Sequence, residues 1–154
     1  MDNTVKLWEV ARASMSSSNP NSYVAVVDDD DSVCRSFSRL LRAAGYQPVS
    51  YSSAEGFLED TKRPRFDCLV LDIQLEGITG LELRRRLAAV NDATPVVFIT
   101  AHDNPAVRAE AEASGCAGYF SKADPGAAVL EAIRKAVTVS SHQMPNPNQL
   151  SNIP

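Results

Sequence analysis

The chain has 154 residues and an apolar share of 44%, the size and composition of one ordinary globular domain. Its formal charge of -4 argues against a general affinity for nucleic acids or anionic membranes. The first fifteen residues include charged side chains and no unbroken apolar stretch, so they predict neither a signal peptide nor a membrane span. We therefore expect a cytoplasmic protein. The three cysteines form no C-x-x-C pair, and we expect buried or half-buried free thiols.

Both ends of the chain differ from its middle. Residues 14–22 and the tail from residue 140 consist largely of Ser, Asn and Pro, a composition that does not form packed elements. We expect a disordered N-terminal extension at residues 1–22, a folded domain at residues 23–139, and a disordered tail or truncated linker at residues 140–154.

Five short apolar segments alternate with amphipathic stretches along the folded body. The segments predict strands, and the stretches, which open with helix-start residues, predict helices. In chain order, the predicted strands are Tyr23–Val27, Gln47–Tyr51, Asp67–Leu71, Pro95–Ile99 and Gly118–Ser121.

The five predicted helices follow these strands. The first runs from Ser32 to Ala44 and stops at Gly45; its inner face is expected to carry Val33, Phe37, Leu40 and Leu41. Capping boxes at Ser52–Glu55 and Thr79–Glu82 open the second and third. The third helix should bury Leu83 and Leu87 and expose Arg84, Arg85 and Arg86. The fourth starts near Asp103 and ends at Gly115, and the fifth opens with Asp124 as N-cap and Pro125 as first helical residue.

Strands that alternate with helices at this spacing predict parallel βαβ units, and hence an α/β fold with a doubly wound five-stranded parallel sheet. In the strand order 2-1-3-4-5, ligands bind outside the carboxyl ends of the strands, at the switch point between strands one and three. Asp28 and Asp29 follow strand one, and Asp72 follows strand three. Thr100 and Lys122 follow strands four and five and join the same rim.

The charges at this rim indicate its chemistry. Three carboxylates and the Lys122 ammonium leave two net negative charges, which one divalent cation would neutralise. Mg²⁺ suits this site because it prefers oxygen ligands and commonly binds one or two carboxylates together with phosphate. With the cations on the oxygens of a phosphoryl group, a carboxylate could attack phosphorus and hold the group as an acyl phosphate. The Thr100 hydroxyl could donate to such a group, and the small Ala101 leaves the entry open.

Other site classes fit the residues less well. A haloacid-dehalogenase-type phosphatase needs a second aspartate two positions after the first, where Gln74 stands. An EF-hand loop begun at Asp28 would need glycine and glutamate where Val33 and Arg39 stand. A flavodoxin-like cofactor protein would bind a phosphate in its first loop, where four aspartates would repel it.

Read together, these residues resemble the receiver domain of two-component response regulators, over nearly all of residues 23–139. The resemblance depends on four motifs and their spacing. The pair Asp28-Asp29 is followed by Asp72, which lies 44 residues after Asp28. The pair Thr100-Ala101 begins 28 residues after Asp72, and Lys122 lies 22 residues after Thr100. Each follows its own predicted strand. Within the family the chain looks most like the nitrogen-fixation regulator (FixJ-like) branch, judged by the segments Val27–Phe37 and Tyr51–Glu55.

The resemblance implies a CheY-like, flavodoxin-like (βα)5 fold and a role for each site residue. Asp72 would be the phosphoacceptor, and Mg²⁺, with Mn²⁺ as a substitute, would bind Asp28, Asp29, Asp72 and the main-chain oxygen of Gln74. Lys122, Thr100 and Ala101 would stabilise the phosphoryl group. Thr100 and Tyr119 would form the conformational switch, and Gln74 and His102 would modulate the phosphoryl lifetime.

The implied partners are a sensor histidine kinase or a histidine phosphotransfer protein, and a downstream protein or second copy of the chain at the face of the fourth helix, fifth strand and fifth helix. The chain would be a signalling phosphoacceptor rather than an enzyme, with self-catalysed phosphotransfer and slow autodephosphorylation. Only fifteen residues follow Val139, too few for a DNA-binding helix-turn-helix, so we expect no direct nucleic acid binding by this chain. We also expect no membrane binding, because the sequence predicts no membrane span. It would be a stand-alone receiver or the receiver fragment of a longer DNA-binding regulator. An alternative is a receiver-fold interaction module with little or no phosphorylation.

Two positions depart from the family pattern. Leu75-Glu76 stands where a Met-Pro pair is common, so the loop after Asp72 lacks a proline and gains a carboxylate. Ala123 follows Lys122 where proline, often after a cis bond, is usual. A cis bond before a residue other than proline costs about 2.5–4 kcal/mol, and we therefore predict a trans Lys122–Ala123 bond.

Overall fold

The computed structural model describes residues 22–143. The expectations for residues 1–21 and 144–154 lie outside the described residues. Ser22, which we expected in the N-terminal extension, is buried, and its carbonyl accepts a hydrogen bond from the Gln47 N–H. The last helix continues to Gln143, past the predicted boundary at residue 139.

Five parallel strands form one sheet in the predicted order β2-β1-β3-β4-β5. Three of them have the predicted bounds and two begin and end one residue later than predicted. The strands are β1 Tyr23–Val27, β2 Gln47–Tyr51, β3 Cys68–Asp72, β4 Val96–Thr100 and β5 Gly118–Ser121. The central strands β1, β3 and β4 are almost wholly apolar and buried, as expected for strands covered on both faces.

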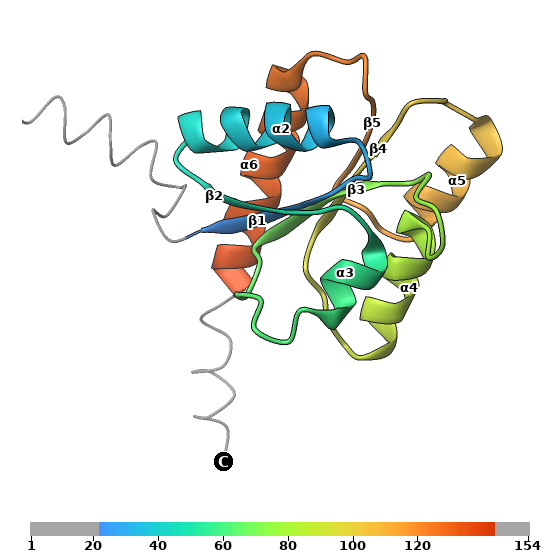
Figure 1. The fold of residues 1–154 in the computed structure, drawn as a ribbon, viewed down its shortest axis with the longest axis horizontal. Helices are drawn as coiled ribbons and strands as arrows, with labels where there is room; N and C mark the ends of the chain where they lie inside the picture. The colour runs from blue at the N-terminus through green and yellow to red at the C-terminus, as the bar shows by residue number, and fades with distance from the viewer. Residues whose placement is uncertain (1–21, 144–154) are drawn as a thin grey trace, which may run out of the picture.

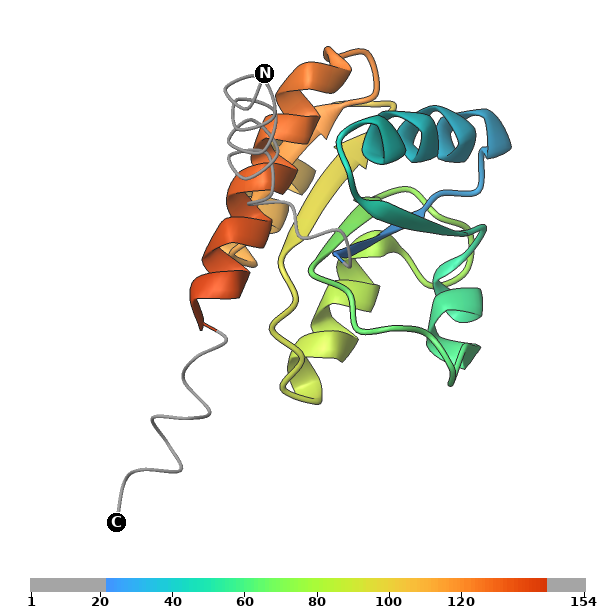
Figure 2. The same cartoon turned by 90° about the vertical axis from the view of Figure 1, so that its left-hand side faces the viewer.

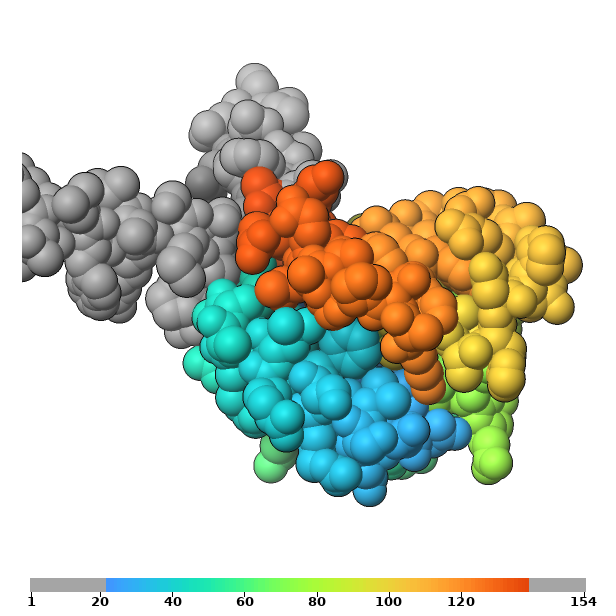
Figure 3. All heavy atoms as spheres, turned by 90° about the horizontal axis from the view of Figure 1, so that it is seen from above, coloured from blue at the N-terminus to red at the C-terminus, as the bar shows by residue number. Residues whose placement is uncertain are grey.

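Five helices of the described chain cover the two faces of this sheet. Their bounds are α2 Asp31–Ala43, α3 Ala54–Glu59, α4 Gly80–Ala89, α5 Pro105–Ala113 and α6 Gly126–Gln143. Helices α2 and α6 lie on one face, and α3, α4 and α5 lie on the other (Figures 1 and 2). Figure 3 shows α2 and α6 side by side on their face.

Each face of the sheet has its own apolar core. Alternate residues of β1 divide between them: Val24 and Val26 pack under α2 and α6, and Ala25 and Val27 pack under α3, α4 and α5. Leu83 and Leu87 of α4 are buried as predicted. Cys34 and Cys68 are buried and Cys116 is half-buried, all as free thiols, which confirms that expectation.

The inner face of α2 differs from the prediction. Its buried residues are Cys34, Ser38 and Leu41, whereas Val33, Phe37 and Leu40 are only half-buried. Small side chains at the inner positions let the helix lie close to the sheet, where the hydroxyls of Ser38 and Ser50 are 3.1 Å apart. Leu41 is fully buried as predicted. Leu40, by contrast, lies at the side of the helix and faces Gly126 of α6.

Several helix starts also differ from the prediction. The N-cap of α3 is Ser53, whose hydroxyl accepts from the Gly56 N–H, so Ser52–Glu55 is not a capping box. Helix α5 begins at Pro105 with Asn104 as N-cap. Before α6, the Asp124 carboxylate accepts from the Ser121 N–H.

The start of α4 follows half of the predicted capping box. Thr79 caps the helix as predicted, but the Glu82 side chain contacts Arg85 and Arg86 instead of returning to the cap. Arg85 also pairs with Glu110 of α5. Arg85 and Arg86 are exposed as predicted, whereas Arg84 is half-buried.

All peptide bonds of the described residues are trans, including the Lys122–Ala123 bond, as predicted. Among the helices of residues 22–143, none combines the length and the apolar character that crossing a membrane would require.

Candidate functional site

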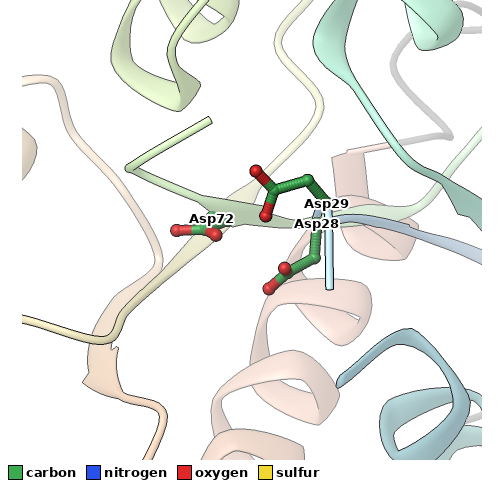
Figure 4. Close-up of side chains that lie close together, drawn as sticks. All are labelled: Asp28, Asp29 and Asp72. Atoms are coloured by element: carbon green, nitrogen blue, oxygen red, sulfur yellow. The ribbon is translucent and has the colours of Figure 1, made fainter. Parts of the chain in front are cut away.

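Three aspartates meet at the carboxyl end of the sheet. Asp28 follows β1 directly, Asp29 is the next residue, and Asp72 is the last residue of β3. Figure 4 shows their side chains gathered at the ends of these two strands, and one carboxylate oxygen from each lies within 4.8 Å of the others. Asp28 and Asp72 are buried, with 0% and 2% of their surface exposed, and Asp29 is exposed. The site is therefore open to solvent on the Asp29 side.

Backbone hydrogen bonds of the sheet fix the two buried aspartates. The Asp28 N–H donates to the carbonyl of Tyr51 in β2, over 3.0 Å, which continues the β1–β2 ladder past the end of β1. Asp72 lies opposite Ile99 in the β3–β4 register. Because central strands are the most constrained part of such a fold, the positions of these two carboxylates are set by the sheet.

Lys122 connects the two buried carboxylates. It follows β5, and its N–H donates to the carbonyl of Thr100 over 2.8 Å. Its Nζ donates a hydrogen bond to Asp72 Oδ2 at 3.0 Å and lies 2.9 Å from Asp28 Oδ2. The second contact has the distance of an ion pair but not the angles of a hydrogen bond, so Asp28 Oδ2 is a buried oxygen without a hydrogen-bond donor.

Burial and charge act in opposite directions at this site. Burial raises the pKa of Asp28 above its ordinary value, against the effects of Lys122 and of the Asp30 N–H, which donates to Asp28 Oδ1. Burial alone would lower the pKa of Lys122, but the contacts with Asp28 and Asp72 outweigh it and the pKa of Lys122 is raised. Lys122 is therefore a firmly charged ammonium between two carboxylates.

The loop of residues 73–79 carries the next part of the rim. The Gln74 N–H donates to Asp72 Oδ1 at 2.9 Å, while the Gln74 side chain is exposed. The Gly80 N–H donates to the carbonyl of Ile73, and a Cβ on Gly80 would overlap the main-chain oxygen of Asp72. The loop is thus folded tightly against the end of β3.

Thr100, the last residue of β4, is fully buried. Its hydroxyl donates to the carbonyl of His102 at 2.9 Å and accepts from the His102 N–H at 3.1 Å. The side chains of Ala101 and His102 are exposed. In this conformation, the Thr100 hydroxyl is engaged by the backbone of its own loop.

Tyr119 is largely buried, and its hydroxyl donates to Asp103 Oδ1 at 3.1 Å. The guanidinium of Arg108 lies 4.9 Å from the centre of the Tyr119 ring and 3.5 Å from Asp103 Oδ2. Burial, followed by the Asp103 hydrogen bond, raises the pKa of Tyr119. The residues Asp103, Arg108 and Tyr119 form a cluster that we call the Tyr119 latch.

The partners of Tyr119 and one further contact are not predicted by the sequence. The Glu55 carboxylate, expected to cap α3, accepts from the Ile78 N–H in the loop after β3. For Asp103 and Arg108 the sequence predicts only a place in the fourth helix. Local sequence patterns hold no signal for these contacts, which join residues from different elements.

The site residues fit a hard divalent cation. Asp28, Asp29 and Asp72 offer carboxylate oxygens to a common point, and the buried Asp28 Oδ2 has an unused acceptor position. Carboxylate and carbonyl oxygens are the ligands that Mg²⁺ takes in proteins. Of the described residues, these are the three whose acidic side chains are grouped closely enough for such a site.

The chain is similar in sequence and in structure to known response regulators. The model of the response regulator receiver domain matches residues 24–134. The response regulator protein TmoT of Ectopseudomonas mendocina is 32% identical over 132 residues, which cover 86% of this chain and 60% of TmoT. The transcriptional regulatory protein FixJ of Azorhizobium caulinodans is 33% identical over 120 residues, covering 78% of this chain and 57% of FixJ.

A solved structure of the response regulator StyR superposes with a TM-score of 0.78 and 33% identity, covering 85% of this chain and 66% of StyR. The chain thus spans about 60% of the length of the curated relatives it matches. The strand order, the acidic rim and the match over residues 24–134 agree with one another. The chain therefore belongs to the receiver-domain family of response regulators, as the sequence resemblance predicted.

Proposed function

We propose that this chain is the phosphoacceptor receiver of a two-component system and that Asp72 accepts a phosphoryl group from a phosphohistidine. The donor would be a sensor histidine kinase or a histidine phosphotransfer protein, met in the cytoplasm. One observation carries the proposal: a single ammonium, Lys122 Nζ, lies within 3.0 Å of oxygens of both Asp28 and Asp72 at the end of the sheet. A cation that already contacts the acceptor carboxylate can move to the oxygens of an incoming phosphoryl group.

The transfer follows from these positions. A carboxylate oxygen of Asp72 attacks phosphorus and forms an O–P bond, the P–N bond to the donor imidazole breaks, and its electron pair returns to the ring nitrogen. Such a transition state is loose and highly charged, so positioning and charge neutralisation supply most of the catalysis. Lys122 would neutralise one phosphoryl oxygen, and the Gln74 N–H would keep Asp72 oriented. Ala101 would leave room for the group.

Asp28, Asp29, Asp72 and the main-chain oxygen of Gln74 would hold Mg²⁺, or Mn²⁺ in its place. When bound, the ion supplies positive charge to the phosphoryl oxygens. Without it, the three carboxylates and Lys122 carry two net negative charges, which would repel the phosphoryl group.

Phosphorylation would switch a surface of the domain. The Thr100 hydroxyl would leave the His102 backbone and donate to a phosphoryl oxygen. The Tyr119 latch would open, and Tyr119 would turn inward behind Thr100. This change would alter the face made by α5, β5 and α6, which would bind a downstream protein or a second copy of the chain. Gln74 and His102 would modulate the phosphoryl lifetime by controlling the access of water.

Incubation with acetyl phosphate and Mg²⁺ tests the proposal. Intact-mass measurement should show the gain of one phosphoryl group in the wild type and in Asp31→Asn, an exposed aspartate in the same acidic segment. Asp72→Asn should show none. The proposal fails if the wild type gains no mass or if Asp72→Asn gains as much as the wild type. A protein without label would instead be an interaction module with the receiver fold.

A further inference from the structure

Glu55 reaches from one element of the fold to the loop that borders the acidic site. It is the second residue of α3, and its Oε2 accepts a hydrogen bond from the Ile78 N–H at 2.9 Å. Ile78 lies in the loop of residues 73–79, between Asp72 and the Thr79 cap of α4. The contact therefore ties this loop to the neighbouring βα unit.

Gly77 makes room for this contact. Its φ of +75° is in the left-handed region that favours glycine. A Cβ at Gly77 would also overlap Oε2 of Glu55. The same glycine thus permits both the turn of the loop and the close approach of the carboxylate.

Besides the Glu55 contact, the loop is held by the buried side chain of Leu75 and by the packing of Ile78 against the same core. Its first part is fixed by the Gln74 N–H on Asp72, and its end by the Gly80 N–H on the Ile73 carbonyl. Residues 73–79 contain no proline, so no ring restricts their backbone, and Gly77 adds conformational freedom. A bond from outside the loop limits this freedom. The Ile78 hydrogen bond is also the first cause of the lowered pKa of Glu55, as expected for a donor that favours the charged carboxylate.

We propose that Glu55 is a positioning residue for metal binding: through the Ile78 N–H it holds the loop so that the main-chain oxygen of Gln74 faces the aspartate cluster. The inference rests on the proposed function, in which that oxygen is a Mg²⁺ ligand. Residues that orient metal ligands without touching the metal typically contribute 10–100-fold in affinity. Glu55 acts in this way from α3, outside the rim itself.

The test compares four variants of the full chain. Glu55→Ala removes the acceptor, Glu55→Asp keeps the charge but shortens the side chain by one methylene, and Glu55→Gln keeps an amide oxygen that can accept from Ile78. Glu59→Ala, an exposed glutamate of the same helix, is the matched control. Mg²⁺ titration followed by NMR gives Kd, and hydrogen exchange of the Ile78 amide without Mg²⁺ reports the bond directly.

We expect Kd to rise about tenfold in Glu55→Ala and Glu55→Asp, at the low end of the range for such residues, and Ile78 exchange to accelerate in both. Glu55→Gln and Glu59→Ala should remain close to the wild type. Wild-type affinity in Glu55→Ala and Glu55→Asp would overturn this inference alone. A wild type that binds no Mg²⁺ would overturn the proposed function and this inference with it.

Discussion

Lys122 shows how a single side chain sets the charge state of the receiver site. Its ammonium contacts a fully buried carboxylate, Asp28, and a nearly buried one, Asp72. Burial penalises every charge at this position, and the raised pKa of Asp28 records that penalty. Of the described residues, Lys122 is the one whose cation pairs with these carboxylates. When no metal is bound, the stability of the two buried negative charges therefore depends on the Lys122 ammonium.

We predict that Lys122→Met destabilises the metal-free protein by about 3 kcal/mol, the lower end of the range for breaking a buried ion pair. The side chain is 21% exposed, which is why the lower end applies. Urea unfolding in the presence of EDTA measures the change. Mg²⁺ should stabilise this variant more than the wild type, because it would replace the missing cation.

The control is Lys135→Met, which removes an exposed lysine of α6 and should change stability by no more than about 0.5 kcal/mol. Equal losses in the two variants would mean that the Lys122 contacts contribute nothing beyond an ordinary surface lysine.

At the scale of elements, the contact between β3 and the start of α4 shapes the site loop. Gly80 is the first residue of α4, and its Cα lies against the backbone of Asp72 and Ile73. This close approach brings the loop of residues 73–79 back over the acidic rim. A side chain at this position would push the helix away from the strand end.

We predict that Gly80→Ala destabilises the protein by about 1–2 kcal/mol. Helix propensity alone favours alanine by up to about 1 kcal/mol. The alanine Cβ, however, overlaps the backbone of Asp72, which cannot move aside as a flexible side chain can. The shift that this overlap forces costs about 1–3 kcal/mol. Equilibrium unfolding in urea measures whether the free energy of unfolding falls or rises.

Gly126→Ala is the matched control, because Gly126 is the first residue of α6 and a Cβ there would meet only the end of the Leu40 side chain, at 3.2 Å. This variant should be neutral or slightly stabilising. If Gly80→Ala is more stable than the wild type, the contact between β3 and the start of α4 has room for a methyl group.

The elements themselves were largely predictable, for physical reasons that differ between strands and helices. Buried parallel strands are continuous apolar runs, so the central strands β1, β3 and β4 lie within one residue of the predicted bounds. The edge strands β2 and β5 have the predicted bounds although they are less buried. For α2, apolar periodicity pointed to Val33 and Phe37, but packing close to the sheet selects the small Cys34 and Ser38. Close packing depends on side-chain size as well as on polarity, which the pattern of apolar residues does not record.

At the scale of the whole molecule, the topology brings together what the sequence separates. The doubly wound order predicts that the ends of β1, β3, β4 and β5 share one rim, and Asp28, Asp72 and Lys122 do meet there. Contacts between side chains of different loops follow from no such rule. The bond between Glu55 and Ile78 and the Tyr119 latch depend on distances between elements, which became known only with the fold.

The position of Asp29 offers a way to test the proposed metal site separately from the stability of the fold. Asp29 is exposed and supplies its carboxylate to the cluster, whereas Asp28 and Asp72 are buried and contact Lys122. We predict that Asp29→Ala changes the unfolding free energy of the metal-free protein by no more than about 0.5 kcal/mol. The same change should greatly reduce the stabilisation by Mg²⁺, because it would remove one of the proposed ligands.

A ligand that binds only the folded state at ten times its Kd stabilises it by about 1.4 kcal/mol. The wild type should gain this amount at the corresponding Mg²⁺ concentration, and urea unfolding with Mg²⁺ or EDTA measures it. Asp31→Ala, an exposed aspartate in the first turn of α2, should keep the gain. If Asp29→Ala also keeps the stabilisation by Mg²⁺, Asp29 is not a ligand. If both variants lose this stabilisation, the cause is the charge of the acidic segment rather than coordination by Asp29.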